Sequence, residues 1–471
     1  ETTARKRARR RLPRRQPYSS ARSRKTRMRA TATLLTLHAC TRTFALDDGL
    51  ARTPPMGYRT WNDILGNVNQ SYVQRIVDAV VSKARGASLA DLGYGRVGTD
   101  DGWQRCDAGR QIGRTPPLPN NGTSFHADDG SPLVNASRFP SMASMVAYGH
   151  ARGIKMDFYL LNCICMDEYT LQADPAWAQK CYAGDVELLL AAGFDGVKID
   201  NCGDDQGVGY VSRLRHLNAS EKRLVIENSN QGFGNPWFVP HRRPAGPPRE
   251  NPTNGSDYCP FHMFRTGGDI SATFGNIYQK LQFVRPYLAA DNPISRPGCW
   301  AFPDQLEVGN FPPGPLAFVE SRTHFGAWCV VSSPLYLSTS LLDEARMATV
   351  WPVISNKEAI QVNQMWHGHP GRLVLEGTSG TSHWQCWAKH GPSGAQAVLV
   401  LNAGSESINT TIPFDRLGLP CHSGGDGTRN ATSCSARDIW AHADLAPMAD
   451  AWTVTGLGPH DSRFVVFTPT A

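Results

Sequence analysis

Acidic residues follow short apolar segments at three places in this chain, which is where a strand would deliver a carboxylate to a pocket. The run Gly-Val-Lys-Ile-Asp-Asn-Cys releases Lys198 and Asp200 as its apolar part ends. Asp269 ends a second such segment, and Asp100 with Asp101 ends a third. Paired carboxylates beside aromatic residues are typical of glycoside hydrolysis, so the pattern indicates that chemistry.

The segments that must position these residues alternate between strand-like and helix-like patterns from residue 55 to residue 340. The predicted strands are residues 56–61, 94–100, 154–159, 196–200, 224–228, 263–269, 299–304 and 328–337. Helical periodicity marks intervening stretches such as residues 73–83, 142–152 and 184–192. Strands that alternate with helices in this number predict an α/β fold, the (β/α)₈ TIM barrel, whose site lies at the carboxyl ends of the strands.

The sequence pattern changes after about residue 375, where short predicted strands alternate with turns rich in Gly, Ser and Pro. The predicted strands are residues 372–376, 384–388, 396–401, 410–414, 439–443 and 464–468. This pattern predicts a C-terminal antiparallel β-sandwich. We therefore expect a basic leader at residues 1–45, a catalytic barrel at 46–370 and the sandwich at 371–471, with residues 238–256 as a loop insertion in the barrel.

The basic charge of the chain belongs to its first residues. Residues 1–30 hold 13 Lys or Arg and one acid, Glu1, so without them the net charge of +7 becomes 7 − 12 = −5. A basic segment followed by Leu34, Leu35 and Leu37 is typical of a secretory leader, and an organellar transit peptide is the alternative. No run of 18 apolar residues occurs, so we expect no membrane-spanning helix. We also expect no nucleic-acid partner, because a nucleic-acid protein built on the basic segment would not explain the ordered motifs further along the chain.

Sequons and cysteines both favour the secretory pathway. Seven Asn-x-Ser/Thr sequons and 12 Cys are present, which is typical of a glycosylated protein from an oxidising compartment. None of the cysteines has the paired C-x-x-C spacing of a zinc site, so disulfides are the better interpretation and we expect no bound metal. The disulfide candidates are Cys163, Cys165, Cys202, Cys421 and Cys434.

Several ordered motifs resemble glycoside hydrolase family 27, the α-galactosidases or melibiases. The similarity opens with Arg-Thr-Pro-Pro-Met-Gly-Tyr-Arg-Thr-Trp-Asn at residues 52–62 and continues through Asp-Asp-Gly-Trp, Lys-Ile-Asp-Asn-Cys and Arg-Thr-Gly-Gly-Asp. It then includes Pro-Asp-Gln-Leu-Glu-Val-Gly-Asn at residues 303–310 and later motifs up to residue 364. The family fold is a barrel followed by a sandwich, in agreement with the pattern of elements.

The resemblance implies a role for each matching position. Asp200 would be the nucleophile of a retaining double displacement, and Asp269 the general acid and base. The resemblance also implies binding residues of five kinds, in this order: an acidic pair that binds galactose hydroxyls, two aromatic residues that pack on the sugar, two cations beside the catalytic carboxylates, a further acid of the pocket, and a residue that contacts the 2-substituent. These are Asp100, Asp101, Trp61, Tyr159, Lys198, Arg265, Asp304 and Glu227.

Two departures from the family pattern bear on specificity and on the disulfides. Gly102 stands where many members have Cys, so a common disulfide is missing and Cys106 needs another partner. Residues 225–232 match the family's 2-substituent loop weakly, so either Glu227 or Asn228 fills that position.

The predicted function is therefore removal of terminal α-D-galactosyl residues from a carbohydrate substrate without a cofactor. Three alternatives stay open at this point: an α-N-acetylgalactosaminidase, a β-L-arabinopyranosidase, and a non-catalytic carbohydrate-binding barrel. The last would be expected to lose Asp200 or Asp269, and both are present. For the oligomeric state, a homodimer is kept as a hypothesis.

Overall fold

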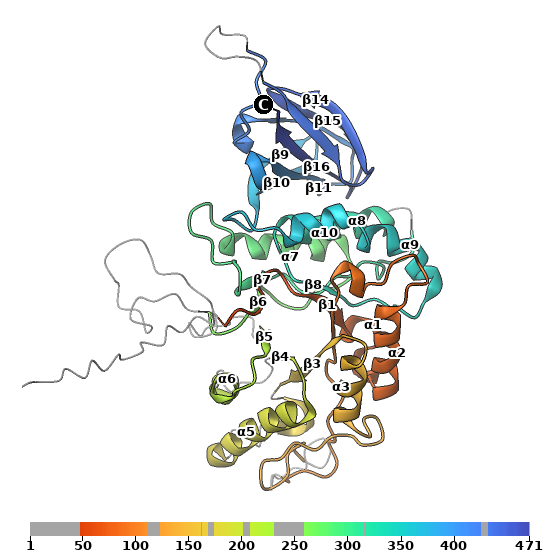
Figure 1. The fold of residues 1–471 in the computed structure, drawn as a ribbon, viewed down its shortest axis with the longest axis vertical. Helices are drawn as coiled ribbons and strands as arrows, with labels where there is room; N and C mark the ends of the chain where they lie inside the picture. The colour runs from red at the N-terminus through yellow and green to blue at the C-terminus, as the bar shows by residue number, and fades with distance from the viewer. Residues whose placement is uncertain are drawn as a thin grey trace, which may run out of the picture. The chain divides into compact units, whose positions relative to one another are not determined.

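The computed structural model describes residues 48–111, 123–161, 163–167, 174–200, 208–229, 259–314, 317–424 and 432–470. The predicted leader, the predicted loop insertion at 238–256 and Cys202 lie outside these ranges. Within them the chain forms an eight-stranded parallel sheet surrounded by helices, followed by two antiparallel sheets (Figure 1).

The parallel sheet has the order expected of a (β/α)₈ barrel, with consecutive strands as neighbours and β1 beside β8. The strands are β1 (Met56–Arg59), β2 (Arg96–Gly98), β3 (Lys155–Leu160), β4 (Gly196–Ile199), β5 (Val225–Asn228), β6 (Met263–Arg265), β7 (Trp300–Phe302) and β8 (Leu335–Leu337). Between β7 and β8 the barrel is closed by the residue Leu306, whose N–H donates to Tyr336 O at 2.7 Å and whose carbonyl accepts from Ser338 N at 3.3 Å. The predicted fold class is confirmed.

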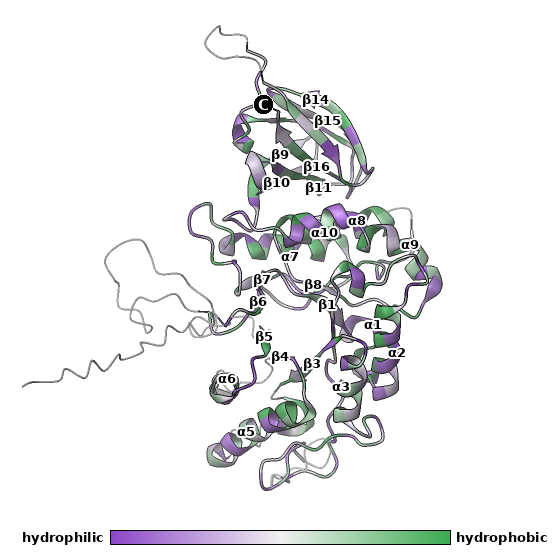
Figure 2. Cartoon of the chain, viewed as in Figure 1, coloured by the Kyte–Doolittle hydropathy of each residue, from purple (hydrophilic) through white to green (hydrophobic). Residues whose placement is uncertain are grey.

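Helices follow or separate the strands, and local sequence signals explain where they begin. They are α1 (Trp61–Ile64), α2 (Gln70–Val81), α3 (Met142–His150), α5 (Pro175–Ala192), α6 (Val208–Ala219), α7 (Phe274–Val284), α8 (Ala317–Val330), α9 (Glu344–Ile354) and α10 (Lys357–Gln364). Helix α5 begins after Asp174, which accepts a hydrogen bond from Trp177 N, and has Pro175 in its first turn. It ends at Gly193 in the left-handed conformation, a common helix terminus. Hydrophilic and hydrophobic residues are both present along these helices (Figure 2), and α2 and α7 each bury one apolar face in the core.

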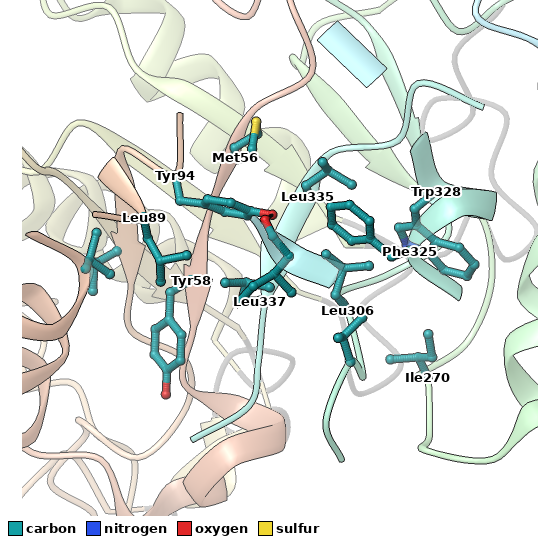
Figure 3. Packing of buried hydrophobic residues seen from close by; sticks show 14 of the residues in the cluster. Met56, Tyr58, Leu89, Tyr94, Ile270, Leu306, Phe325, Trp328, Leu335 and Leu337 are labelled. Atoms are coloured by element: carbon teal, nitrogen blue, oxygen red, sulfur yellow. Dashed lines mark hydrogen bonds between the residues drawn. The ribbon is translucent and has the colours of Figure 1, made fainter. Parts of the chain in front are cut away.

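The main core lies between strands and helices of the barrel. Met56 of β1, Leu335 and Leu337 of β8, and Phe325 and Trp328 of α8 are buried in one cluster (Figure 3). The predicted strand at residues 328–337 is wrong in its first part, because Trp328 belongs to α8 and only Leu335–Leu337 is β8. Helix α8 is buried over most of its length between the barrel and the C-terminal sheets, so its apolar run has no polar face that would reveal a helix.

The C-terminal strands form a six-stranded sheet in the order β14-β13-β16-β11-β10-β9 and a two-stranded sheet of β12 and β15. Their bounds are β9 (Arg372–Ser379), β10 (Ser382–His390), β11 (Gln396–Asn402), β12 (Ile408–Pro413), β13 (Cys434–Asp438), β14 (Ala443–Met448), β15 (Ala451–Leu457) and β16 (Ser462–Pro469). Ile412 and Trp452 of the small sheet share a core with Val398 and Phe467 of the large one, as in a sandwich. The predicted strand at residues 439–443 is wrong, since it covers the turn between β13 and β14 and the first residue of β14.

Candidate active site

A cavity of about 230 Å³ lies where the barrel strands end, and every predicted catalytic and binding residue except Glu227 lines it. Its walls come from residues that follow or end β1, β2, β3, β4, β6 and β7. Parallel strands deliver their carboxyl ends to one edge of a barrel, which explains why residues so distant in sequence meet here. The lining residues are Trp61, Asn62, Asp100, Asp101, Tyr159, Leu161, Cys163, Lys198, Asp200, Arg265, Asp269, Asp304 and Gln305.

Asp200 follows β4 directly, and three hydrogen-bond donors of the described residues face it. The Tyr159 hydroxyl donates to Asp200 Oδ2 at 3.0 Å, and Lys198 Nζ lies 3.5 Å from the same oxygen. Arg265 Nη2 lies 3.5 Å from the other oxygen, Oδ1. Donors directed at both oxygens stabilise the carboxylate form, which is the form that a nucleophile requires.

Lys198 joins two carboxylates within the cavity. Its Nζ donates to Asp100 Oδ2 at 2.8 Å and also lies near Asp200, over the ring of Tyr159. Burial would lower the pKa of the Lys198 ammonium, but the carboxylates of Asp100 and Asp200 outweigh burial and raise it above its usual value. Lys198 is therefore a fixed positive charge.

Arg265 connects the two predicted catalytic carboxylates. Its Nη1 donates to Asp269 Oδ1 at 2.7 Å and lies 3.7 Å from Asp304 Oδ2, while Nη2 faces Asp200. The two carboxylates differ in exposure: the Asp269 side chain is 74% exposed and the Asp200 side chain 15% exposed. An exposed carboxyl group exchanges protons readily with solvent, as a general acid and base must, whereas a shielded one is suited to attack on carbon.

Burial also affects three other polar groups in the cavity. It raises the pKa of Asp101 and of Asp304, and with the neighbouring carboxylate of Asp200 it raises the pKa of Tyr159 well above its usual range. Tyr159 is thus a permanent hydrogen-bond donor at any pH where the protein would work.

Asp304 has an unusual backbone conformation. Its φ is 107°, a region that residues other than glycine rarely adopt, and its carboxylate accepts from Ile270 N at 3.0 Å and Gln305 N at 2.8 Å. Strained backbone that the surroundings hold in place is concentrated at functional sites.

Glu227 is the predicted binding residue that does not line the cavity. It is buried on β5, where it accepts from Arg59 Nη2 at 2.7 Å and from the Ser229 hydroxyl at 3.0 Å. Asn228, the alternative for this position, is also buried and also lies outside the cavity lining. The remaining positions of this loop, from residue 230 onward, lie outside the described residues.

Sequence reasoning assigned no binding role to four of the lining residues: Asn62, Leu161, Cys163 and Gln305. Asn62 follows Trp61 directly and Gln305 follows Asp304, so adjacency to predicted residues was the available signal.

Disulfides hold loops at the rim of the cavity and in the sandwich. Cys106 pairs with Cys165, Cys259 with Cys299, and Cys421 with Cys434. Cys163 is disulfide-bonded as well, whereas Cys181, Cys329 and Cys386 are free and buried. Cys165 is therefore linked to Cys106 and is not available to Cys202.

The geometry at Gly102 explains why no cysteine stands there. Its φ is 108°, and a Cβ atom at this position would lie 2.5 Å from the carbonyl oxygen of Gly66. Arg138 Nη1 donates to that same carbonyl and to Gly102 O, which fixes the two segments together. A side chain at residue 102 would therefore require this close approach to open and the backbone to change.

Among the described residues, no cluster of His, Cys, Asp or Glu has the arrangement of a metal site, and no helix has the length and apolar character needed to span a membrane.

Comparison with known proteins identifies the family. The family model described as "Alpha galactosidase A" matches residues 53–365, about two thirds of the chain, and "Alpha galactosidase C-terminal beta sandwich domain" matches residues 381–467. The chain belongs to the alpha-galactosidase A family. It is thus a glycoside hydrolase of family 27, and carbohydrate is its substrate class.

Relatives of this alpha-galactosidase family member differ in the sugar that they are named for. An alpha-galactosidase from Oryza sativa is 26% identical over 90% of this chain and 87% of its own length. An alpha-N-acetylgalactosaminidase from Gallus gallus is 26% identical over 80% of this chain and 85% of its own length. The structure of the Saccharomyces cerevisiae alpha-galactosidase has the same fold, with a TM-score of 0.68, 18% identity, and coverage of 90% of this chain and 99% of that one.

Proposed function

We propose that this protein hydrolyses terminal α-D-galactosyl residues with retention of configuration, using Asp200 as nucleophile and Asp269 as general acid and base. The observation that supports these assignments best is the contact of one guanidinium, that of Arg265, with both carboxylates at the edge of the cavity. Family membership supports the reaction, and the buried cation pair of Lys198 and Arg265 supports an ionised nucleophile.

In the first step, Asp200 attacks the anomeric carbon while the Asp269 carboxylic acid donates its proton to the departing glycosidic oxygen. A covalent glycosyl-enzyme ester forms and the bond to the aglycone breaks. In the second step, Asp269 as carboxylate takes a proton from water, the water attacks the anomeric carbon, and Asp200 leaves as the carboxylate. Donors from Tyr159, Lys198 and Arg265 stabilise Asp200 in the state in which it leaves.

The remaining lining residues supply recognition. Asp100 and Asp101 accept hydrogen bonds from vicinal hydroxyl groups, and Trp61 and Tyr159 offer aromatic surface for the apolar face of the sugar. Asp304 contributes a further acceptor.

The division of the chain into residues 1–45, 46–370 and 371–471 is part of the proposal, as is passage of the protein through the secretory pathway. Disulfides in both the barrel and the sandwich fit a secreted or lysosomal enzyme. A homodimer is the proposed oligomer, and sedimentation of the purified protein tests it.

Kinetics with p-nitrophenyl α-D-galactopyranoside test the reaction, with the α-N-acetylgalactosaminide and the β-L-arabinopyranoside as parallel substrates. The two parallel substrates are included because neither Glu227 nor Asn228 is among the lining residues of the cavity, so no described residue is assigned to the 2-substituent. We expect turnover of the galactoside by the wild type and its loss in Asp200→Asn. Activity of the wild type on one of the other sugars alone would contradict the proposed specificity.

Rescue of activity by azide distinguishes the nucleophile from the general acid and base. Azide should yield the β-galactosyl azide with Asp200→Gly, because it attacks the substrate directly, and the α-galactosyl azide with Asp269→Gly, because it attacks the glycosyl-enzyme. Glu187→Gln removes an exposed carboxylate of α5 and is the matched control. The opposite anomers would reverse the assignment.

A further inference from the structure

A chain of side chains runs from helix α9 to the cavity wall and fixes the orientation of two amides there. Arg346 Nη1 donates to Asn310 Oδ1 at 3.0 Å, and Asn310 Nδ2 donates to Glu307 Oε2 at 2.6 Å. Asn62 Nδ2 donates to the other Glu307 oxygen, Oε1, and Gln305 Nε2 donates to Asn62 Oδ1 at 3.3 Å.

Each link in this chain has a defined direction. The Arg346 guanidinium is only a donor, so Asn310 must present its oxygen to it and its amino group to Glu307. As a carboxylate, Glu307 accepts on both oxygens, so Asn62 presents its amino group to Glu307 and its oxygen to Gln305. Asn62 is further held by its N–H, which donates to the Ser338 hydroxyl at 2.9 Å.

The last amide in the chain has an unused acceptor. Gln305 Oε1 is buried, and among the residues that the structure describes it has no hydrogen-bond donor. A buried acceptor without a donor is unfavourable, so this arrangement favours a ligand that donates a hydrogen bond to it. Gln305 lines the cavity, so a group bound in the cavity lies next to this amide.

We propose that Asn62 and Gln305 form a polar subsite of the cavity that hydrogen-bonds one hydroxyl group of the sugar substrate, and that Glu307 is the positioning residue that orients this amide pair. A hydroxyl group both donates and accepts, so it complements Gln305 Oε1 and the half-buried amide of Asn62 together. The inference rests on the proposed glycosidase function and adds a contact to the acids and aromatic residues already named.

The hydroxyl can belong to the galactosyl unit or to the sugar that leaves. Kinetics with the 2-, 3-, 4- and 6-deoxy forms of p-nitrophenyl α-galactoside test the first source. The ratio of kcat/KM for an α-galactosyl trisaccharide to that for the aryl galactoside tests the second. Such ratios do not depend on the folded fraction of a variant, so a loss of stability alone leaves them unchanged.

The variants are Asn62→Leu and Gln305→Met, which keep the side-chain volume and remove the amide, with Gln361→Met on the exposed face of α10 as control. In the wild type, removal of the partner hydroxyl should lower kcat/KM about 3- to 10-fold, the range for one neutral hydrogen bond. In Asn62→Leu and in Gln305→Met the same removal should have a smaller effect, and in the double variant it should have none. Glu307→Gln should reduce this discrimination while both amides are still present.

Loss of discrimination at a ring hydroxyl assigns the subsite to the galactosyl unit, and a change confined to the trisaccharide ratio assigns it to the leaving sugar. Discrimination ratios equal to those of the wild type for every substrate in both variants would overturn the subsite. An inactive wild type would instead contradict the proposed function. In that case calorimetric binding of galactose and its deoxy forms gives the same comparison without turnover.

Discussion

The hydroxyl group of Tyr159 lies 3.0 Å from Asp200 Oδ2, and it donates to the oxygen that also faces Lys198. Oδ2 of Asp200 therefore faces a neutral and a charged donor, whereas Oδ1 faces the guanidinium of Arg265. The phenol is neutral at any working pH, because burial and the adjacent carboxylates raise its pKa. Its contribution is therefore that of a hydrogen bond and not of a charge.

Removing this hydrogen bond should weaken the nucleophile's preference for the ionised form. For Tyr159→Phe we expect kcat/KM to fall about 10- to 100-fold, the range for a hydrogen bond to a charged group. The acid limb of the pH profile should move to higher pH, because Asp200 then protonates more easily. The pH dependence of kcat/KM measures both effects, with Tyr148→Phe, whose hydroxyl donates to Asp78 outside the cavity, as control. An unchanged acid limb would contradict the assignment.

The buried pair of Lys198 and Asp100 should be costly to break from one side. Lys198→Met leaves the carboxylate of Asp100 buried without its cation, and we expect a loss of about 3–5 kcal/mol in the free energy of unfolding. Denaturant unfolding measures this loss. The double variant Lys198→Met with Asp100→Asn should recover most of the stability but none of the activity. If the double variant does not recover stability, Lys198 stabilises the barrel by packing alone.

Glu307 should make the barrel less stable as the pH rises. Burial raises the pKa of Glu307 from 4.5 to about 7, so between these values the folded protein holds a proton that the unfolded chain has lost. The free energy of unfolding therefore falls through this window, by an amount on the order of 3 kcal/mol at most. Glu307→Gln removes the window, so its Tm relative to the wild type should rise from pH 4.5 to pH 8. Calorimetry at these two pH values is the measurement, and a constant difference would contradict it.

The charged form of His126 should stabilise the folded protein, and this stabilisation should decrease as the pH rises. Its ring lies between Asp167, 2.8 Å from Nδ1, and Asp185, 3.0 Å from Nε2, all of them buried. Burial would lower the pKa of His126, but these two carboxylates outweigh burial and raise it well above 6.5. The stabilisation is complete below pH 6.5 and is lost as the pH rises through the raised value.

His126→Gln should therefore cost more stability at pH 5.5 than at pH 9. Differential scanning calorimetry of both proteins at the two pH values provides the comparison. The exposed His216 of α6 offers a control, since His216→Gln should shift Tm equally little at both. An equal cost for His126→Gln at both pH values would mean that the imidazole is neutral in the folded protein.

The sequence allowed prediction of the barrel and most of the cavity because the informative residues lie at strand ends. Asp200 follows β4 directly and Lys198 lies within it, so the apolar run placed both at the mouth of the barrel, whereas their roles came from the resemblance to the family motifs. Glu227 has a similar local pattern on β5, but Arg59 of β1 pairs with it in the barrel interior. No local signal reports such a partner 168 positions away.

The errors in secondary structure have a similar origin. Residues 439–443 contain the buried Ile439 and half-buried Trp440, which are apolar enough to predict a strand, yet they form a turn that packs toward the barrel. Trp440 lies close to Gly326 of α8, so a tertiary contact determines its burial. The sequence did not show which cysteines would be free thiols. Cys386, for example, is a free thiol buried in a strand like its apolar neighbours.

In the part of the chain that the structure describes, β7 and β8 are joined through the single bridge at Leu306, which affects how the barrel can open. Backbone hydrogen bonds across this junction are few, and the polar contact between Gln305 and Asn62 spans the same junction from the β7 side to the β1 side. A sugar that contacts both Asp304 and Asp100 would connect the two sides of the barrel across this junction, where few backbone hydrogen bonds do so. Occupancy of the pocket should therefore slow amide hydrogen exchange at this junction, because opening of the barrel there would require the sugar to leave first.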